Sequence, residues 1–255
     1  MRTNQFVLLH TLFCAALLGF SSCKADRKIS ITASRTEMTA QWDSMPNEKA
    51  KEILAPYKAK VDSIMSPVIG ESAMDMTAKR PESLLSNLIA DVLRNSTTPY
   101  IGQPADVAVI NVGGLRNSLG KGPITYRTTY EILPFENSLC ILYLKGSDLK
   151  DLMADIIKVG GEGLSNVQMT VDKEMDIVDV KIGNQPIDND RLYAIATVDY
   201  LAEGNDRMTA FNQAQKRLCI EEATIRNIFI EYVKDQAAKG KALTSQIDGR
   251  VRILE

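Results

Sequence analysis

Histidine is almost absent from this chain. The 255 residues include a single histidine, His10, which lies in an apolar segment near the N-terminus. Zinc sites built on imidazole, Ser-His-Asp triads and histidine general bases all need histidine inside the folded domain. If His10 leaves with a cleaved leader, the remaining chain can form none of these sites. Any chemistry would then depend on carboxylates, lysine, tyrosine or cysteine.

An excess of charge of one sign is lacking as well. The 30 Lys and Arg residues nearly balance the 32 Asp and Glu residues, which leaves a net charge of −2. Without a basic stripe we expect no nucleic-acid partner, and without a long acidic run we expect no solvated acidic arm. The hydrophobic content of 45% is ordinary for a globular protein, and the length suits one large domain or two small ones.

Long apolar runs are missing after the first twenty residues. Residues 6–20 are mostly apolar, follow Arg2, and precede small residues and Cys23. This run is too short to span a bilayer, and it resembles a bacterial lipoprotein signal. We therefore predict a leader over residues 1–22 and a lipid on Cys23, which would anchor an exported protein in the bacterial envelope, periplasmic or at the cell surface. Because Phe20 departs from the commonest pattern, a plain secretory signal is the alternative.

Two of the four cysteines lie near the N-terminus and two lie in the predicted domain. Cys14 would leave with the leader and Cys23 would carry the lipid, so Cys140 and Cys219 remain in the domain. Export permits a disulfide between them. Cys140 lies inside the apolar run 139–144, where a buried free thiol is equally expected. The sequence leaves both possibilities open.

Apolar periodicity predicts helices and strands without strict alternation. The helices are expected at 47–65 with an interruption at Pro56, at 81–93, at 148–158 with Ser147 as the cap, and at 225–233. The strands are expected at 68–70, 107–110, 139–144, 167–171, 178–182, 193–197 and 251–253. This order predicts one α+β (mixed α/β) domain over residues 46–255, with a mixed sheet flanked by helices and a polar tether over residues 23–45.

A glycine turn follows the apolar run 107–110. Gly113 and Gly114 allow a sharp turn and a close approach of a ligand to the backbone. Asn111 before the turn and Arg116 after it could point at the same ligand. An ordinary tight turn with polar flanks is the alternative for a lone glycine pair.

Five spaced motifs carry a resemblance to a known family. Residues 111–116 (Asn-Val-Gly-Gly-Leu-Arg) are similar to the Asn-Gly-Gly-Gly-Ile-Arg signature of the 5'-nucleotidase C-terminal domain. Residues 122–126, 133–137, 193–197 and 200–206 follow in the family's order, so the resemblance covers about residues 68–255. It implies a domain that holds the nucleoside part of a substrate, beside a separate N-terminal metallophosphatase domain that holds two metals and cuts the phosphate ester.

The resemblance implies a role for each matching residue. Asn111, Gly113, Gly114 and Arg116 would form the first side of the pocket, with Arg80 as a further ligand. Phe135 and Tyr200 would sandwich the base, and Asp206 would accept the ribose hydroxyls. These residue types suit the task, because aromatic faces hold a flat base and a carboxylate can accept from two hydroxyls. Without the motifs, the aromatic residues would be assigned to core packing.

Two departures from the family pattern bear on the pocket. Val112 replaces a glycine of the first motif, and residues 205–207 (Asn-Asp-Arg) replace Gly-Asp-Gly in the last. We expect Val112 to reshape or weaken the pocket, because it adds a branched side chain to the turn. The metallophosphatase half is also missing upstream of the matching residues, so the chain is not expected to hydrolyse nucleotides alone. It needs neither metal nor cofactor for binding.

Three functions fit these observations. The first is the nucleoside- or nucleotide-binding half of a 5'-nucleotidase-type system, which acts with a separate metallophosphatase protein in extracytoplasmic nucleotide catabolism. The second is a non-catalytic surface lipoprotein that captures nucleosides. The third is an interaction scaffold that kept the fold and lost the pocket.

Overall fold

The computed structural model describes residues 29–254, apart from the side chain of Asp43. The predicted leader and the lipidation site at Cys23 lie outside the described residues. Contacts divide the chain into two units, residues up to Lys51 and residues Glu52–Glu255, which are described separately. No helix in the described part of the chain is both long and apolar enough to cross a membrane.

The described part of the first unit has little regular structure. Residues 29–39 form neither helix nor strand, and a short 3-10 helix, η1 (Ala40–Ser44), follows. The indole of Trp42 donates a hydrogen bond to the carbonyl of Glu37 over 2.7 Å, which closes this helical turn locally.

The second unit contains the mixed α/β domain. The helices are α2 (Glu48–Met65, which begins in the first unit), α3 (Leu84–Asn95), α4 (Thr98–Ile101), α5 (Tyr126–Ile132), α6 (Gly146–Lys158), α7 (Asp199–Ala202) and α8 (Ile225–Ala238). The 3-10 helices are η2 (Val112–Gly114), η3 (Asn205–Arg207) and η4 (Thr209–Gln213). The strands are β1 (Val68–Ser72), β2 (Val107–Ile110), β3 (Gly122–Thr125), β4 (Ser138–Lys145), β5 (Gly163–Ser165), β6 (Val167–Val171), β7 (Ile177–Ile182), β8 (Gln185–Pro186), β9 (Leu192–Val198), β10 (Lys216–Thr224) and β11 (Val251–Ile253).

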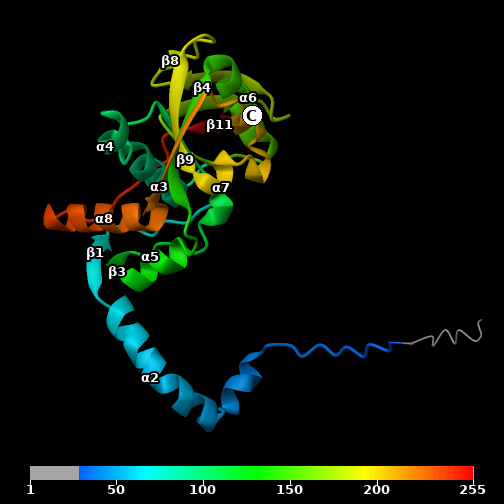
Figure 1. Cartoon of the computed structure of the whole chain (residues 1–255), viewed down its shortest axis with the longest axis vertical. Coiled ribbons are helices and arrows are strands. Elements are labelled where there is room, and N and C mark those ends of the chain that lie inside the picture. Colours follow the sequence, from blue (N-terminus) through cyan, green and yellow to red (C-terminus); the bar gives the residue numbers. More distant parts are fainter. Residues whose placement is uncertain (1–28, 255) are drawn as a thin grey trace, which may run out of the picture. The chain divides into compact units, whose positions relative to one another are not determined.

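A five-stranded mixed sheet forms the centre, in the order β10-β4-β9-β2-β5. Strands β9 and β2 run parallel, and the other neighbours are antiparallel. All four residues of β2 are buried, as are six of the seven in β9, so these strands are covered on both faces. Helices α3 and α6 pack against this sheet (Figure 1). The predicted mixed sheet with flanking helices is therefore confirmed.

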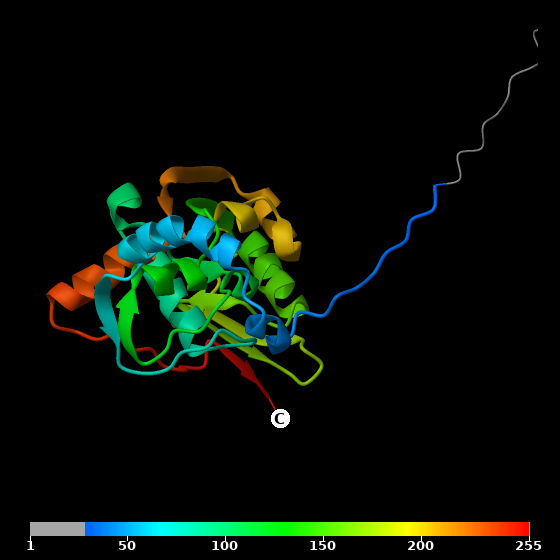
Figure 2. The ribbon, with the colours of Figure 1, turned by 90° about the horizontal axis from the view of Figure 1, so that it is seen from below.

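Two smaller sheets complete the domain. Strands β11-β6-β7-β8 form a four-stranded sheet in which β11 and β6 are parallel. Strands β1 and β3 form an antiparallel ribbon. Figure 2 shows this ribbon (cyan and green) next to α8 (orange), which contacts β1. Gly70 of β1 has no room for a side chain, because a Cβ there would lie 2.5 Å from Val233 of α8.

The predicted interruption of the first helix at Pro56 is wrong. Helix α2 continues through Pro56 without a break. Proline removes one backbone donor, which frees the carbonyl four residues earlier. Here that residue is Glu52, which is exposed, so water can hydrate the carbonyl. The helix has no buried residue, and its apolar side chains Ile53, Tyr57 and Ile64 are exposed.

Two predicted helix starts are also shifted. Helix α3 begins at Leu84 rather than Pro81, because Ser83, the residue before it, has extended backbone angles. Helix α6 begins at Gly146, so Ser147 lies inside the helix and is not its cap. A Cβ on Gly146 would lie 1.9 Å from the carbonyl oxygen of Asp188, so glycine alone permits this close approach.

The open question about the cysteines is answered by a disulfide. Cys140 of β4 and Cys219 of β10 are bonded, and they face each other directly in the antiparallel register. Cys140 is completely buried. The bond therefore fixes an edge strand of the central sheet to its neighbour.

Candidate functional site

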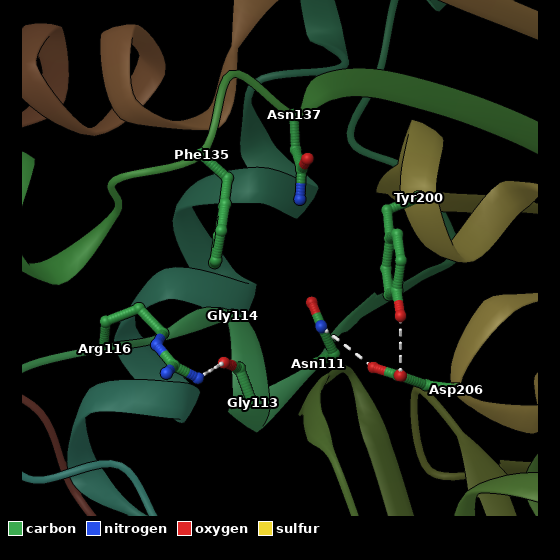
Figure 3. A pocket seen from close by; sticks show the side chains of 8 residues that line it. All are labelled: Asn111, Gly113, Gly114, Arg116, Phe135, Asn137, Tyr200 and Asp206. Atoms are coloured by element: carbon green, nitrogen blue, oxygen red, sulfur yellow. Dashed lines mark hydrogen bonds between the residues drawn. The ribbon is translucent and has the colours of Figure 1, made fainter. Parts of the chain in front are cut away.

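A cavity of about 390 Å³ opens where several loops follow the central strands. It is lined by residues from the turn after β2, the segment between α5 and β4, helix α7 and helix η3 (Figure 3). The lining residues are Asn111, Gly113, Gly114, Arg116, Phe135, Asn137, Tyr200 and Asp206. Seven of the eight predicted site residues are thus brought together, and Arg80 is not among them.

The turn after β2 is built by its glycines. The backbone N–H of Gly114 donates to the carbonyl of Asn111 over 3.0 Å, which closes the 3-10 turn η2. A Cβ on Gly114 would lie 2.8 Å from Oδ1 of Asn111, so a side chain at this position would displace the asparagine. Gly113 faces open space. The turn therefore places Asn111 and a bare stretch of backbone at the cavity.

Val112 does not enter the cavity. Its side chain is buried, and the residue is not part of the cavity lining. Its backbone N–H donates to Oε2 of Glu162 over 2.5 Å. Val112 therefore adds no side chain to the cavity lining, and its expected effect on the pocket stays a prediction.

Glu162 stabilises the turn through its hydrogen bond with Val112. Its side chain is fully buried and also forms an ion pair with Arg80. The Arg80 Nε donates to the carbonyl of Gly161 over 2.8 Å. Arg80 therefore supports the glycine turn through Glu162 instead of lining the cavity. The sequence offered a weak signal for Glu162, a single carboxylate within the glycine-rich loop 160–163.

Burial raises the pKa of Glu162 above its ordinary value. The hydrogen bond from Val112 and the contact with Arg80 act in the opposite direction, and the nearby charge of Asp206 adds to the increase. Desolvation disfavours the charged form of a carboxyl group more strongly than these two partners favour it.

Two aromatic rings stand on opposite sides of the cavity. Figure 3 shows Phe135 on one side and Tyr200 on the other, with Asn137 between them at the far edge. The Phe135 side chain is 49% exposed and Tyr200 is 40% exposed, whereas large aromatic residues of the core, such as Phe211, are completely buried. Core packing therefore does not explain the two exposed rings, and the space between them can accept a flat ring system.

Asp206 is held from two directions. The amide of Asn111 donates to Oδ2 over 3.0 Å, and the hydroxyl of Tyr200 donates to Oδ1 over 3.0 Å (Figure 3). The hydrogen bond to Asp206 is the main reason why the pKa of Tyr200 is raised. Asp206 has a φ of 53° and Arg207 one of 66°, so two residues other than glycine adopt the left-handed conformation here.

Arg116 and Asn137 complete the polar lining. The guanidinium of Arg116 donates to the carbonyl of Gly113 over 3.1 Å, and the side chain is exposed beside Phe135. The sequence predicts no role for Asn137. The available signal was its place in the motif at residues 133–137, two residues after Phe135.

The arrangement suits binding of a ring with polar edges. The two aromatic faces can stack on it, Arg116 and Asn137 offer hydrogen-bond donors, and Asp206 offers acceptors. Within residues 29–254, no group of three or more histidine, cysteine, aspartate or glutamate side chains could hold a metal ion.

The fold and this cavity belong to a defined class of domain. Residues 64–213 match the family described as 5'-nucleotidase, C-terminal domain. This match spans more than half of the chain, and the chain therefore belongs to that family. The resemblance inferred from the motifs is confirmed.

The chain is also similar to known proteins. The chain is 36% identical over 165 residues to Endonuclease YhcR of Bacillus subtilis, a match that covers 62% of this chain and 13% of that protein. It is 31% identical over 164 residues to Protein UshA of Yersinia enterocolitica, covering 61% of this chain and 29% of that protein. The chain thus spans less than a third of either relative.

A solved structure supports the fold. The 5'-nucleotidase precursor from Thermus thermophilus superimposes with a TM-score of 0.69 at 28% identity, covering 82% of this chain and 43% of that one. The NAD nucleotidase of Haemophilus influenzae superimposes with a TM-score of 0.61 at 19% identity, covering 87% of this chain and 46% of that one, which shows the shared fold alone.

Proposed function

We propose that this chain is the nucleoside- or nucleotide-binding half of a 5'-nucleotidase-type system. The observation that carries the proposal is the cavity itself, in which Phe135 and Tyr200 face each other above Asp206. A base would stack between the rings, and the ribose hydroxyls would donate to the carboxylate. Arg116 and Asn111 would contact polar edges of the ligand, with Gly113 and Gly114 allowing close approach. Arg80 would act indirectly, through Glu162.

A separate metallophosphatase is the proposed partner for hydrolysis. The family and the Thermus thermophilus relative are both named for a 5'-nucleotidase, and this chain covers 43% of that relative. In this proposal the second protein holds the metals and cuts the phosphate ester, while this chain presents the nucleotide. The system would serve nucleotide catabolism outside the cytoplasm.

We also propose export and lipid anchoring. Residues 1–22 would be removed as a leader, Cys23 would carry the lipid, residues 23–45 would serve as the tether and residues 46–255 as the domain. A relative that is 25% identical over 231 residues, covering 80% of this chain and 29% of that protein, is the cell wall protein Lmo0130 of Listeria monocytogenes. Expression of the full chain and of Cys23→Ala in bacteria tests the anchor. The wild type should partition with membranes and Cys23→Ala should not, and equal partitioning would contradict the proposal.

Calorimetry on the isolated chain tests the binding proposal. Adenosine, AMP and uridine are titrated into the wild type, Phe135→Ala and Tyr100→Ala. Tyr100 is a matched control, because it is a 44% exposed aromatic residue outside the cavity. We expect saturable binding to the wild type and to Tyr100→Ala. Phe135→Ala should lose roughly 1–3 kcal/mol of binding free energy, the usual contribution of base stacking. Unchanged affinity in Phe135→Ala would exclude the stacking arrangement.

A mixing experiment tests the partner. An exported metallophosphatase that lacks a C-terminal domain of this family is combined with the chain, and phosphate release from AMP is measured with and without a chelator. We expect the mixture to release phosphate faster than either protein alone. Nucleoside binding without any such gain would instead favour a lipoprotein that captures nucleosides.

A further inference from the structure

A buried arginine, Arg226, contacts the segment that carries Phe135, residues 133–137. Arg226 lies in the first turn of α8 and is only 3% exposed. Its Nη1 donates to the carbonyl of Leu133 over 3.0 Å and to that of Pro134 over 3.1 Å, and Nη2 pairs with Glu136. These contacts flank Phe135 on both sides. Arg226 also lies outside residues 64–213, the part that matches the family.

Two further contacts attach this segment and the helix before it, α5, to the start of α8. The Arg226 guanidinium stacks over the ring of Tyr130, with 4.0 Å between its Cζ and the ring centroid. The backbone N–H of Ile225 donates to the carbonyl of Asn137 over 2.9 Å. The α8 start therefore holds this segment before, beside and after Phe135. The Phe135 ring itself is half exposed, so its position depends on its backbone more than on core packing.

We infer that Arg226 is a positioning residue of the pocket, which sets the distance of Phe135 and Asn137 from Tyr200. The planar guanidinium offers five donors in a fixed fork, so it can satisfy two carbonyls and a carboxylate at once. A lysine would keep the charge but lacks this fork. A methionine would fill similar space and leave the carbonyls of Leu133 and Pro134 without their donor. The ligand part of this inference rests on the proposed function, whereas the positioning part does not.

A tryptophan reporter tests the positioning without any ligand. Trp42 is the single tryptophan of the sequence, so the Trp42→Phe/Phe135→Trp variant emits from position 135 alone. Adding Arg226→Met to this background should lower the fluorescence anisotropy and increase quenching by acrylamide, because the segment loses its anchor. Arg250→Met is the matched control. Arg250 is also buried, at 8% exposure, and is paired with Asp91 and Asp248, but it contacts no residue of the cavity.

Nucleoside affinity gives the second measurement. At temperatures well below unfolding, Arg226→Met should weaken nucleoside binding about tenfold, within the range that loss of one stacking partner produces. Arg250→Met should bind like the wild type. In the Phe135→Ala background, Arg226→Met should cause a smaller further loss, since the part of its effect that acts through Phe135 is already gone. A merely structural role would lower the melting temperature in both arginine variants and leave the affinity of the folded molecules unchanged.

The outcomes separate this inference from the proposed function. If the wild type binds no nucleoside, the proposed function fails, and the reporter at position 135 still decides the role of Arg226. If Arg226→Met does not fold, Arg226→Lys is measured in its place, with the same expected direction. An unchanged reporter signal, or an equal change in Arg250→Met, would overturn the positioning role.

Discussion

The hydroxyl of Tyr200 and the carboxylate of Asp206 are joined by a 3.0 Å hydrogen bond at the edge of the cavity. The other carboxylate oxygen accepts the amide of Asn111, so Asp206 is oriented before any ligand arrives. The ring of the same Tyr200 faces Phe135 across the cavity. One tyrosine therefore links the two proposed recognition elements, the stacking faces and the acceptor for sugar hydroxyls.

Tyr200→Phe separates these two roles. The variant keeps the ring and removes the hydrogen bond, which is worth roughly 0.5–1.5 kcal/mol net. We expect a modest loss of nucleoside affinity, and a larger loss of roughly 1–3 kcal/mol more in Tyr200→Ala, where the stacking face is gone. Calorimetry on both variants measures the difference. Equal affinities of Tyr200→Phe and Tyr200→Ala would show that the ring takes no part in binding.

Glu162→Gln should alter the pH dependence of stability. Burial raises the pKa of Glu162, so the folded chain holds this proton more tightly than the unfolded chain does. The contribution of Glu162 to stability is then full below about pH 4.3, the ordinary pKa of glutamate, and is lost as the pH rises through the folded pKa. Glutamine is neutral and does not undergo this loss. The free energy of unfolding of Glu162→Gln should therefore decline less than that of the wild type as the pH rises.

Urea unfolding at a series of pH values measures this slope. Glu222→Gln is the control, since Glu222 is exposed on β10 and its change should leave the wild-type pH slope in place. Parallel pH profiles for the wild type and Glu162→Gln would contradict the predicted effect of burial.

Arg207→Gly should stabilise the domain. Arg207 has a φ of 66°, a conformation that costs a residue with a Cβ roughly 1–2 kcal/mol and costs glycine little. We expect the variant to unfold about 2–4 °C higher for each kcal/mol gained. Arg252→Gly in strand β11 is the control and should lower the melting temperature, because glycine weakens an ordinary strand position. A lower melting temperature in Arg207→Gly would mean that the arginine side chain contributes more than its backbone costs.

Loss of the disulfide should destabilise the chain strongly. Cys140 and Cys219 are 79 residues apart, and a loop of this length corresponds to roughly 4 kcal/mol in the chain-entropy description. A reductant should therefore lower the melting temperature of the wild type. The Cys140→Ala/Cys219→Ala variant should unfold at a lower temperature than the oxidised wild type, and reductant should not change its melting temperature. A wild type that is insensitive to full reduction, verified by thiol titration, would contradict this expectation.

Local patterns predicted the elements that build the cavity. The strand 107–110, the glycine turn after it and the aromatic residues at 135 and 200 are read from runs of apolar residues and from motif spacing, which act over short stretches of sequence. The helix starts were less well predicted. Helix α6 begins at Gly146, whose backbone N–H donates to the carbonyl of Arg191, and this partner lies too far along the chain for a local pattern to reveal it.

The supporting contacts could not be predicted from local patterns. Arg80 and Glu162 are 82 residues apart, and Arg226 is 90 residues from Glu136. Each arginine alone resembles a solvated or ligand-binding residue in the sequence. Only the folded chain shows that each one stabilises a wall of the cavity from behind.

The contacts between helix α8 and the segment that carries Phe135 help to decide where the ligand-binding domain ends. The segment that matches the family stops at residue 213, before both Cys219 and Arg226. A fragment limited to that segment would keep every side chain that lines the cavity. It would lose the Cys140–Cys219 disulfide and the contacts of Arg226 with the segment that carries Phe135. We therefore expect the smallest fragment that binds a ligand to extend through helix α8.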